Sequence, residues 1–190
     1  MKSEILLIGP IGSGKSTIAE LLYRRTMLPH RSMDLLRWKY FDEIGYDRNI
    51  AREKYNEDGI WGLYRYWKPF EAYAVKRAFE DFRECIFDFG ASQSVYEDDK
   101  LFEQVRRALA PYPHVILLMP SPDREESIQI LHARNIHTAR EQWAVNEHFV
   151  HHHSNYDLAK YTAYTKDKTP DETADEVLTW VRSNGWTYEP

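Results

Sequence analysis

The sequence of 190 residues is poor in several features that would place it in a specialised class. It has one cysteine, Cys85, so an internal disulfide is excluded and an oxidising compartment is not implied. Its apolar runs are too short for a signal peptide or a membrane span. It has no basic tract, and its formal net charge is −5, which disfavours nucleic acid as a partner. With 43% hydrophobic residues, it is expected to be a folded cytoplasmic protein, either a monomer or a homodimer.

Short apolar runs alternate with amphipathic segments along the whole chain. The runs expected to form strands are residues 4–8, 30–35, 85–89, 115–119 and 161–164. The segments expected to form helices are residues 15–25, 69–84, 99–109, 123–133, 146–158 and 170–181. Because strands that alternate with helices form parallel sheets, the pattern predicts an α/β fold with helices on both faces. No repeat or low-complexity linker divides the chain, so we expect a single domain over residues 1–190.

Aromatic residues make up 14% of the chain and concentrate in residues 36–73. We expect a helical cap at about 36–80, with breaks near Gly45 and Gly59 and with Pro69 in the first turn of the next helix. The aromatic side chains suit either the core of this cap or the wall of a pocket for a planar or sugar-like compound.

The most specific motif is the segment Gly-Pro-Ile-Gly-Ser-Gly-Lys-Ser at residues 9–16, which fits G-x-x-x-x-G-K-[ST] between an expected strand and an expected helix. Glycines let consecutive backbone N–H groups converge on phosphate oxygens, and the helix that follows presents its N-terminus to the same anion. Lys15 would bind the β- and γ-phosphates, Ser16 would bind Mg²⁺, and Thr17 would reach the α-phosphate. The motif therefore predicts ATP and Mg²⁺ as ligands. The residues expected to hold the nucleotide are Gly9, Gly12, Ser13, Gly14, Lys15, Ser16 and Thr17.

Two carboxylates follow expected strands near this loop. Asp34 comes just after the second strand, where it would orient or deprotonate an attacking hydroxyl; alternatively, it caps the next helix. Asp88 ends the apolar run Ile-Phe-Asp-Phe at the carboxyl edge of the sheet, where it would hold Mg²⁺.

The opening segment Ile-Gly-Pro-Ile-Gly-Ser-Gly-Lys-Ser-Thr-Ile-Ala resembles the start of a shikimate kinase, within the nucleoside-monophosphate-kinase branch of P-loop proteins. Residues 32–34 stand where that family has an Asp-Ser-Asp triplet, and residues 85–90 where a strand leads into three glycines. Residues 152–159 are similar to its Arg-x-x-x-Tyr-x-x-x-Ala pattern, and residues 166–172 to the late loop that packs against adenine. The resemblance implies a three-layer αβα P-loop NTPase fold with a five-stranded parallel sheet, a helical cap and a short lid.

The same resemblance assigns roles to particular residues. It implies a nucleotide contact from Lys166 and catalytic arginines in a lid at about 134–146, which here would be Arg134 or Arg140 unless both are solvated surface residues. The residues that it places at the acceptor are Asp34, Arg65, Glu71, Gly90 and His152.

The acceptor positions depart from the family pattern. Ser32 replaces the first acid, the triple glycine is reduced to Gly90-Ala91-Ser92, His152 replaces an Arg, and the spacing from Arg65 to Glu71 is wider. The sequence thus predicts a shikimate-kinase-like enzyme that transfers the γ-phosphoryl group of ATP to a different small-molecule acceptor. The alternatives are a P-loop NTPase or regulatory nucleotide-binding protein without a small-molecule acceptor, a scaffold module that has lost chemistry, and a kinase with a macromolecular or sugar-nucleotide target.

Several histidines cluster near residue 150. Helical spacing would place His148, His151 and His152 on one face, as in a metal site, but no cysteine or neighbouring carboxylate completes the set. The preferred interpretation is a polar helix face with His152 near the acceptor.

Overall fold

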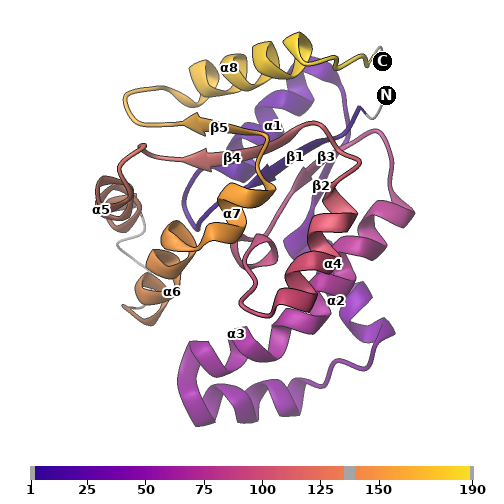
Figure 1. Ribbon diagram of the computed structural model, residues 1–190, viewed down its shortest axis with the longest axis vertical. Coiled ribbons are helices and arrows are strands. Elements are labelled where there is room, and N and C mark those ends of the chain that lie inside the picture. The colour runs from indigo at the N-terminus through magenta and orange to yellow at the C-terminus, as the bar shows by residue number, and fades with distance from the viewer. Residues whose placement is uncertain (1–2, 135–139, 189–190) are drawn as a thin grey trace.

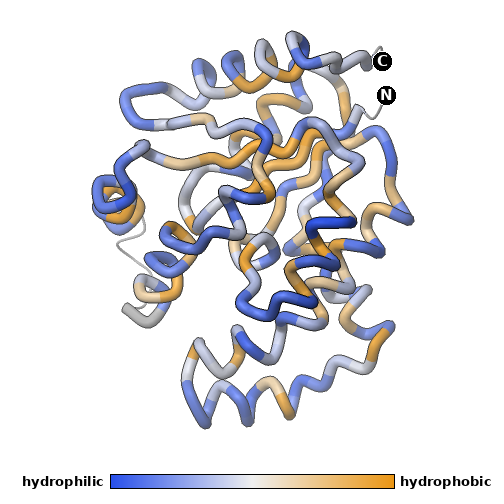
Figure 2. Tube along the Cα trace, in the orientation of Figure 1, coloured by the Kyte–Doolittle hydropathy of each residue, from blue (hydrophilic) through white to orange (hydrophobic). Residues whose placement is uncertain are grey.

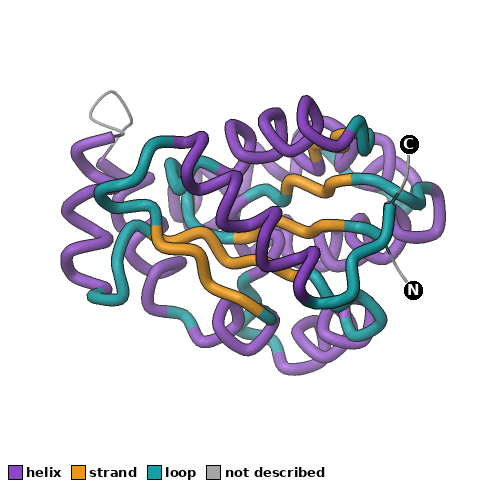
Figure 3. The backbone as a smooth tube through the Cα atoms, turned by 90° about the horizontal axis from the view of Figure 1, so that it is seen from above, coloured by secondary structure: helices purple, strands orange, loops and turns teal. Residues whose placement is uncertain are grey.

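The computed structural model describes residues 3–134 and 140–188, with the side chains of residues 140 and 141 outside that description. Its centre is a sheet of five parallel strands, β1 (Ile5–Ile8), β2 (His30–Ser32), β3 (Ile86–Asp88), β4 (Val115–Met119) and β5 (Tyr161–Tyr164). The strand order is β2-β3-β1-β4-β5, and the sheet lies between layers of helices (Figures 1 and 3). The predicted three-layer α/β fold with five parallel strands is confirmed.

Alternate residues of the central strands face opposite layers. In β1, Ile5 and Leu7 pack with the helices α1 (Lys15–Thr26) and α8 (Pro170–Ser183). Leu6 and Ile8 pack on the other face, whose core includes the C-terminal half of α3 (Arg48–Asp81) together with α4 (Asp99–Leu109) and α7 (His153–Leu158). Both faces of the strands are buried, so these segments are continuously apolar in sequence (Figure 2).

The cap consists of α2 (Met33–Glu43), which begins directly after β2, and α3, whose first half extends away from the sheet (Figure 1). Gly45 has φ 79° between the two helices, and α3 is kinked at Asp58 and Gly59, where Gly59 has φ 53° and ψ −143°. The predicted breaks near both glycines are confirmed. The prediction for Pro69 is wrong, because helix resumes directly after Gly59 and Pro69 lies inside it. Packing of Tyr64 and Phe70 on either side offsets the cost of the lost backbone hydrogen bond.

Most aromatic side chains of the cap form its core. The rings of Phe41, Tyr46, Tyr66 and Phe70 lie 5.1–5.6 Å apart between centroids. Trp67 borders this set, where its Nε1 donates to the Tyr46 hydroxyl at 3.1 Å, and Tyr64 belongs to a separate cluster with Val145 and Phe149. The core interpretation therefore applies to the first four residues, and the pocket-wall interpretation applies to Tyr64 and Trp67, which line a cavity.

The predicted helix over residues 146–158 is wrong in both its start and its continuity. The structure has α6 (Arg140–His151) followed by the separate α7. His152 between them has an extended backbone (φ −66°, ψ 134°), and its Nδ1 accepts a hydrogen bond from the Ser154 backbone N–H at 3.2 Å. A histidine thus caps α7 at a position where sequence propensity indicates one unbroken helix.

The remaining helical elements of the described residues are the 3₁₀ turn η1 (Ala91–Ser94) and the helix α5 (Arg124–Arg134). A loop leads from β5 into α8. Within the described residues, no helix has the length and apolar character needed to cross a membrane. Residues 135–139 of the predicted lid lie outside the described residues.

Candidate active site at the phosphate loop

The predicted phosphate loop connects β1 to α1 at the carboxyl edge of the sheet. Gly9 has φ 138°, and a Cβ at this position would lie 2.5 Å from the carbonyl oxygen of Leu118. Gly14 has φ 96° and forms the N-cap of α1 without a side chain. Side chains at these two positions would strain the backbone or collide with β4, so the loop geometry explains the motif glycines.

Lys15 is buried inside this loop, and its Nζ donates to the carbonyl oxygens of Gly9 and Pro10 at 2.9 Å each. Burial lowers the pKa of the Lys15 ammonium, and the charges of Asp88 and Asp34 oppose that shift. The hydroxyl of Ser13 is also buried and has no hydrogen-bond partner in the described part of the chain. A desolvated cation beside an orphaned hydroxyl fits a bound phosphate group, which would satisfy both.

A cavity of about 260 Å³, here called the loop cavity, opens beside the second half of the phosphate loop. Its lining comes from the loop, α1, the end of α5 and the segment before α8: Gly12, Ser13, Gly14, Thr17, Ile18, Arg134, Thr165, Lys168, Pro170 and Thr173. Arg134 donates to Thr165 Oγ1 at 3.3 Å and to the Gly12 carbonyl at 3.4 Å. The loop cavity thus has the position expected for the rest of a nucleotide bound through its phosphates.

Of the late-loop residues, Lys168 and Pro170 line the loop cavity, whereas the Lys166 side chain forms an ion pair with Glu126. The nucleotide contact implied for Lys166 stays a prediction. Ser16 and Thr17 are exposed at the start of α1, where their hydroxyls are accessible to a ligand.

Asp88 is 5% exposed at the end of β3, next to Leu7 of β1 and Ser32 of β2 in the sheet register. His30 Nε2 lies 3.6 Å from its Oδ2. A buried carboxylate at this edge, close enough to Lys15 to oppose the lowering of its pKa by burial, suits Mg²⁺, held directly or through water. Asp88 and the Ser16 hydroxyl are the side chains that would hold the ion.

Asp34 is the second residue of α2, and Ser32 forms the N-cap, so the helix-cap interpretation of Asp34 is wrong. A Cβ on Gly90 would collide with Asp34 Oδ1, so the family glycine retained here is what allows the carboxylate to approach. Arg37 Nη1 lies 3.2 Å from the same oxygen. The side chain is 55% exposed because it borders an open cavity, yet desolvation by the surrounding protein raises the pKa of the Asp34 carboxyl. The cations Arg37 and Lys15 oppose that shift.

A second cavity of about 370 Å³, here called the cap cavity, lies between Asp34, the cap and α6. Its apolar lining consists of Ile11, Ile60, Tyr64, Trp67, Ala91, Val145 and Phe149. Its polar lining consists of Asp34, Arg37, Ser92 and Gln142. Ile11 borders the cap cavity and Gly12 borders the loop cavity, so the phosphate loop separates two ligand-sized spaces. A larger hollow between α3 and α4 has mainly charged walls and does not include the loop.

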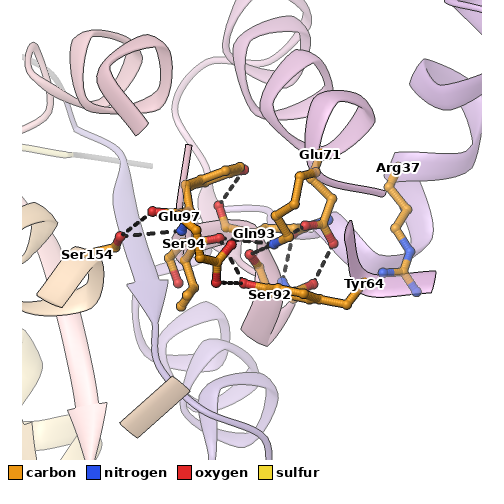
Figure 4. Close-up of polar contacts among 12 residues, drawn as sticks. Arg37, Tyr64, Glu71, Ser92, Gln93, Ser94, Glu97 and Ser154 are labelled. Atoms are coloured by element: carbon orange, nitrogen blue, oxygen red, sulfur yellow. Dashed lines mark hydrogen bonds and ion pairs between the residues drawn. The ribbon is translucent and has the colours of Figure 1, made fainter. Parts of the chain in front are cut away.

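Beneath the cap cavity lies a buried ion pair that the sequence analysis did not identify as such. Lys68 Nζ lies 2.6 Å from Glu71 Oε2 and also donates to the Ser92 carbonyl at 2.6 Å and the Val95 carbonyl at 3.0 Å. Glu71 accepts from the Ser92 hydroxyl (Figure 4). Burial lowers the pKa of Lys68, and Glu71 opposes that shift. Glu71, expected at the acceptor, is fully buried and instead holds the floor of the cavity.

Three other predicted site residues lie elsewhere or outside the description. Arg65 forms an ion pair with Asp58 at the kink of α3, in a separate hollow of the cap. His152 caps α7 and does not appear in the described lining of the cap cavity. Arg140 begins α6, and its side chain lies outside the described residues.

The histidine cluster does receive a carboxylate, from a distant part of the chain. One ligand atom from each of Glu97, His148 and His152 lies within 4.8 Å of the others. Glu97 Oε1 accepts from Tyr64 at 2.7 Å and lies 2.6 Å from His148 Nε2, whereas His151 pairs with Glu125 at 3.3 Å. The Nδ1 of His152 is occupied by its helix cap, so neutral His152 carries its proton on Nε2. These hydrogen bonds give the cluster a structural role that ties Tyr64 to α6.

Two residues at the site, Arg37 and Asn146, were not predicted from the sequence. Arg37 was detectable as a cation three positions after Asp34 on one helix. Asn146 was not detectable, because its 5% exposed side chain contacts a residue 135 positions away. Its Oδ1 accepts from the Ile11 N–H at 2.7 Å and its Nδ2 donates to the Ile11 carbonyl at 3.1 Å. This paired contact fixes α6 to the phosphate loop.

Solved structures of P-loop kinases share this fold over nearly the whole chain. Shikimate kinase from Acinetobacter baumannii, solved in complex with shikimate, has a TM-score of 0.67 and 15% identity, with 98% of this chain and 97% of that chain covered. Shikimate kinase from Aquifex aeolicus has a TM-score of 0.57 and 19% identity, with 97% and 99% covered.

A gluconokinase from Sinorhizobium meliloti has a TM-score of 0.55 and 14% identity, with 97% of each chain covered. No protein-family model matches the chain, and no curated protein matches it in sequence. The structural neighbours therefore establish the fold of shikimate kinase, gluconokinase and related P-loop kinases, as the sequence predicted.

Proposed function

We propose that the protein is a kinase that transfers the γ-phosphoryl group of ATP, with Mg²⁺, to a hydroxyl group of a small molecule. The observation that carries this proposal is the pair of cavities on either side of one phosphate loop, with Lys15 buried in the loop. A protein that only hydrolyses ATP needs the first cavity and a water molecule. A second, ligand-sized cavity that ends at a carboxylate favours transfer to an organic acceptor.

Each residue has a role that its position supports. Lys15 binds the β- and γ-phosphates in place of its two loop carbonyls. Asp34 accepts the proton of the acceptor hydroxyl as that oxygen bonds to the γ-phosphorus and the bond to the β-phosphate oxygen breaks, so that ADP leaves. Arg134, at the border of the loop cavity, stabilises charge on the phosphates. When bound by Ser16 and Asp88, Mg²⁺ would supply neutralisation of phosphate charge.

The acceptor is proposed to differ from shikimate. The neighbours include a shikimate kinase solved with shikimate and a gluconokinase, so this fold serves more than one acceptor. In this chain Arg65 pairs with Asp58, and His152 stands at the position of a family arginine and caps α7. Two side chains that the family pattern assigns to the acceptor are thus engaged in other contacts.

The decisive experiment measures ADP formation from ATP and Mg²⁺ with and without each member of a panel of hydroxylated metabolites, with mass spectrometry of the products. Acceptor-dependent ADP formation with a phosphorylated product supports the proposal. Equal rates with and without acceptors would instead identify an NTPase or regulatory protein. Nucleotide binding with no turnover against the panel would identify a binding module.

A further inference from the structure

The walls of the cap cavity define a chemical class of acceptor. We infer that the acceptor is an uncharged hydroxylated compound built on a flat, unsaturated ring, the class that includes nucleosides and aryl alcohols. This inference rests on the proposed kinase function and deepens it. Its basis is the set of atoms in the lining residues that remain available to a ligand.

The lining has three aromatic residues, and the two that carry a polar atom, Tyr64 and Trp67, present carbon surfaces to the cavity as Phe149 does. The Tyr64 hydroxyl donates to Glu97 at 2.7 Å, and the Trp67 Nε1–H donates to the Tyr46 hydroxyl at 3.1 Å. The polar end of each ring is therefore used outside the cavity. Tyr64 also packs on Phe149 with 5.7 Å between ring centroids, which fixes the ring in place. Rigid aromatic surfaces of this kind favour stacking on a flat ring over contact with a hydrated polyol.

The remaining wall residues strengthen this apolar character. Ile11, Ile60 and Val145 belong with Tyr64 and Phe149 to one hydrophobic cluster at the cavity. The Ser92 hydroxyl donates its hydrogen to the buried Glu71, so it does not offer that hydrogen to a ligand (Figure 4). A carbohydrate-like acceptor would lose hydrogen bonds to water on this wall without replacement, which is costly.

The described charged side chains of the cavity lining, Asp34 and Arg37, form an ion pair with each other, while the buried Nε of Arg37 has no hydrogen-bond partner among the described residues. Arg37 Nη1 lies 3.2 Å from Asp34 Oδ1, and Arg37 Cζ lies 4.8 Å from the ring centroids of both Trp38 and Trp67. Lys68 below the floor is paired with Glu71. A carboxylate or phosphate on the acceptor would therefore add an uncompensated charge next to Asp34 and the triphosphate. An uncharged ring that points a hydroxyl at Asp34 avoids this penalty.

The test is calorimetric binding in the presence of a saturating non-hydrolysable ATP analogue and Mg²⁺, so that ring compounds cannot bind in the loop cavity. The flat neutral probes are thymidine, guanosine and 4-hydroxybenzyl alcohol. The anionic counterparts are thymidine monophosphate, guanosine monophosphate and 4-hydroxybenzoate, and myo-inositol is the neutral saturated ring. We expect at least one flat neutral probe to bind about tenfold more tightly than both its anionic counterpart and myo-inositol.

A charge-introducing variant sharpens the test. Ile60→Arg places a free cation on the cavity wall and should reverse the preference, improving the affinity for the anionic counterpart about tenfold. Ile50→Arg is the matched control, because Ile50 is 40% exposed on the same helix and does not belong to the described cavity lining. The control should retain the preference of the wild type.

Three outcomes would overturn the inference: an anionic probe that binds as tightly as its neutral partner, equal binding of myo-inositol, or no binding of any flat neutral probe at about 10 mM. These outcomes are distinct from failure of the kinase proposal. Selective binding of a flat neutral ring without phosphoryl transfer would refute the kinase function alone. Transfer to a carboxylated acceptor would refute this inference alone.

Discussion

The two cavities of the site are formed by different parts of the chain. The loop cavity combines a glycine-containing backbone turn and the start of α1 with residues from the end of α5 and the segment that leads into α8. The cap cavity is assembled from side chains of α2, α3, η1 and α6. Under the proposed function, main-chain geometry would bind the phosphates of the nucleotide, and side chains would bind the acceptor. Substitutions should therefore separate the two halves.

Lys15→Ala breaks the nucleotide half and should have the largest effect. The buried ammonium is the side-chain cation of the loop, and its loss should lower kcat/KM by about 10³-fold or more and abolish stabilisation by ATP. Turnover assays and thermal shift with and without ATP measure this. Lys76→Ala, an exposed lysine on α3, is the control and should behave as wild type. Surviving turnover in Lys15→Ala would contradict the central role of the loop.

Glu71→Ala breaks the floor of the acceptor half. It leaves Lys68 buried without its carboxylate partner, which should cost about 3–5 kcal/mol of unfolding free energy. The double variant Lys68→Met/Glu71→Leu replaces the pair with apolar groups and should recover most of that loss. Urea denaturation measures both, with Glu57→Ala in an exposed pair as a near-neutral control. If the double variant is no more stable than the single one, the buried charge is not the cause.

Asp34→Asn tests the proton acceptor at the boundary of the two halves. It should lower kcat about 10²-fold while leaving the affinity for ATP unchanged, because the carboxylate acts on the acceptor. A base must be ionised, and burial raises the pKa of Asp34, so wild-type kcat/KM should fall with decreasing pH at a value above that of an ordinary aspartate. The variant should lack this inflection. Asp42→Asn, exposed on the same helix, is the control, and an unchanged pH profile in Asp34→Asn would refute the role.

Asn146→Ala has the smallest expected effect and tests the contact between the halves. Without the two hydrogen bonds to Ile11, the loop is less well ordered before the nucleotide binds. The Kd for ATP should rise about 5–10-fold, equivalent to about 1 kcal/mol. Calorimetry measures this, and Asn49→Ala on the exposed start of α3 should leave the Kd unchanged. An unaltered Kd in Asn146→Ala would mean that α6 does not support the loop.

The same difference between the cavities explains what could be predicted from sequence. The phosphate loop, the position of Asp34 shortly after β2 and of Asp88 at the end of β3, and the parallel sheet follow from local motifs and apolar periodicity. The start of α8 could also be predicted, because Thr169 and Glu172 form a capping box around Pro170.

The parts that escaped prediction depend on contacts between distant segments. His152 interrupts the helical pattern because its ring caps α7, and Pro69 stays inside α3 because packing on both sides supports the helix. The pairing of Arg65 with Asp58 depends on the kink at Gly59. A family pattern gives the positions of such residues in the chain but not the partners that they find in this fold.

The amide of Asn146 also couples the two proposed binding sites, the cap cavity and the phosphate loop. The helix that carries it contributes Val145 and Phe149 to the cap cavity, while the amide itself holds Ile11 of the phosphate loop. A shift of α6 caused by binding at one cavity would therefore change the ligand affinity of the other cavity. Thermodynamic linkage then requires the effect to be reciprocal, so that the factor by which ATP changes the affinity for the acceptor equals the factor by which the acceptor changes the affinity for ATP. One buried side chain thus gives the two proposed substrates a route to cooperate in addition to their direct contact at the transferred phosphoryl group.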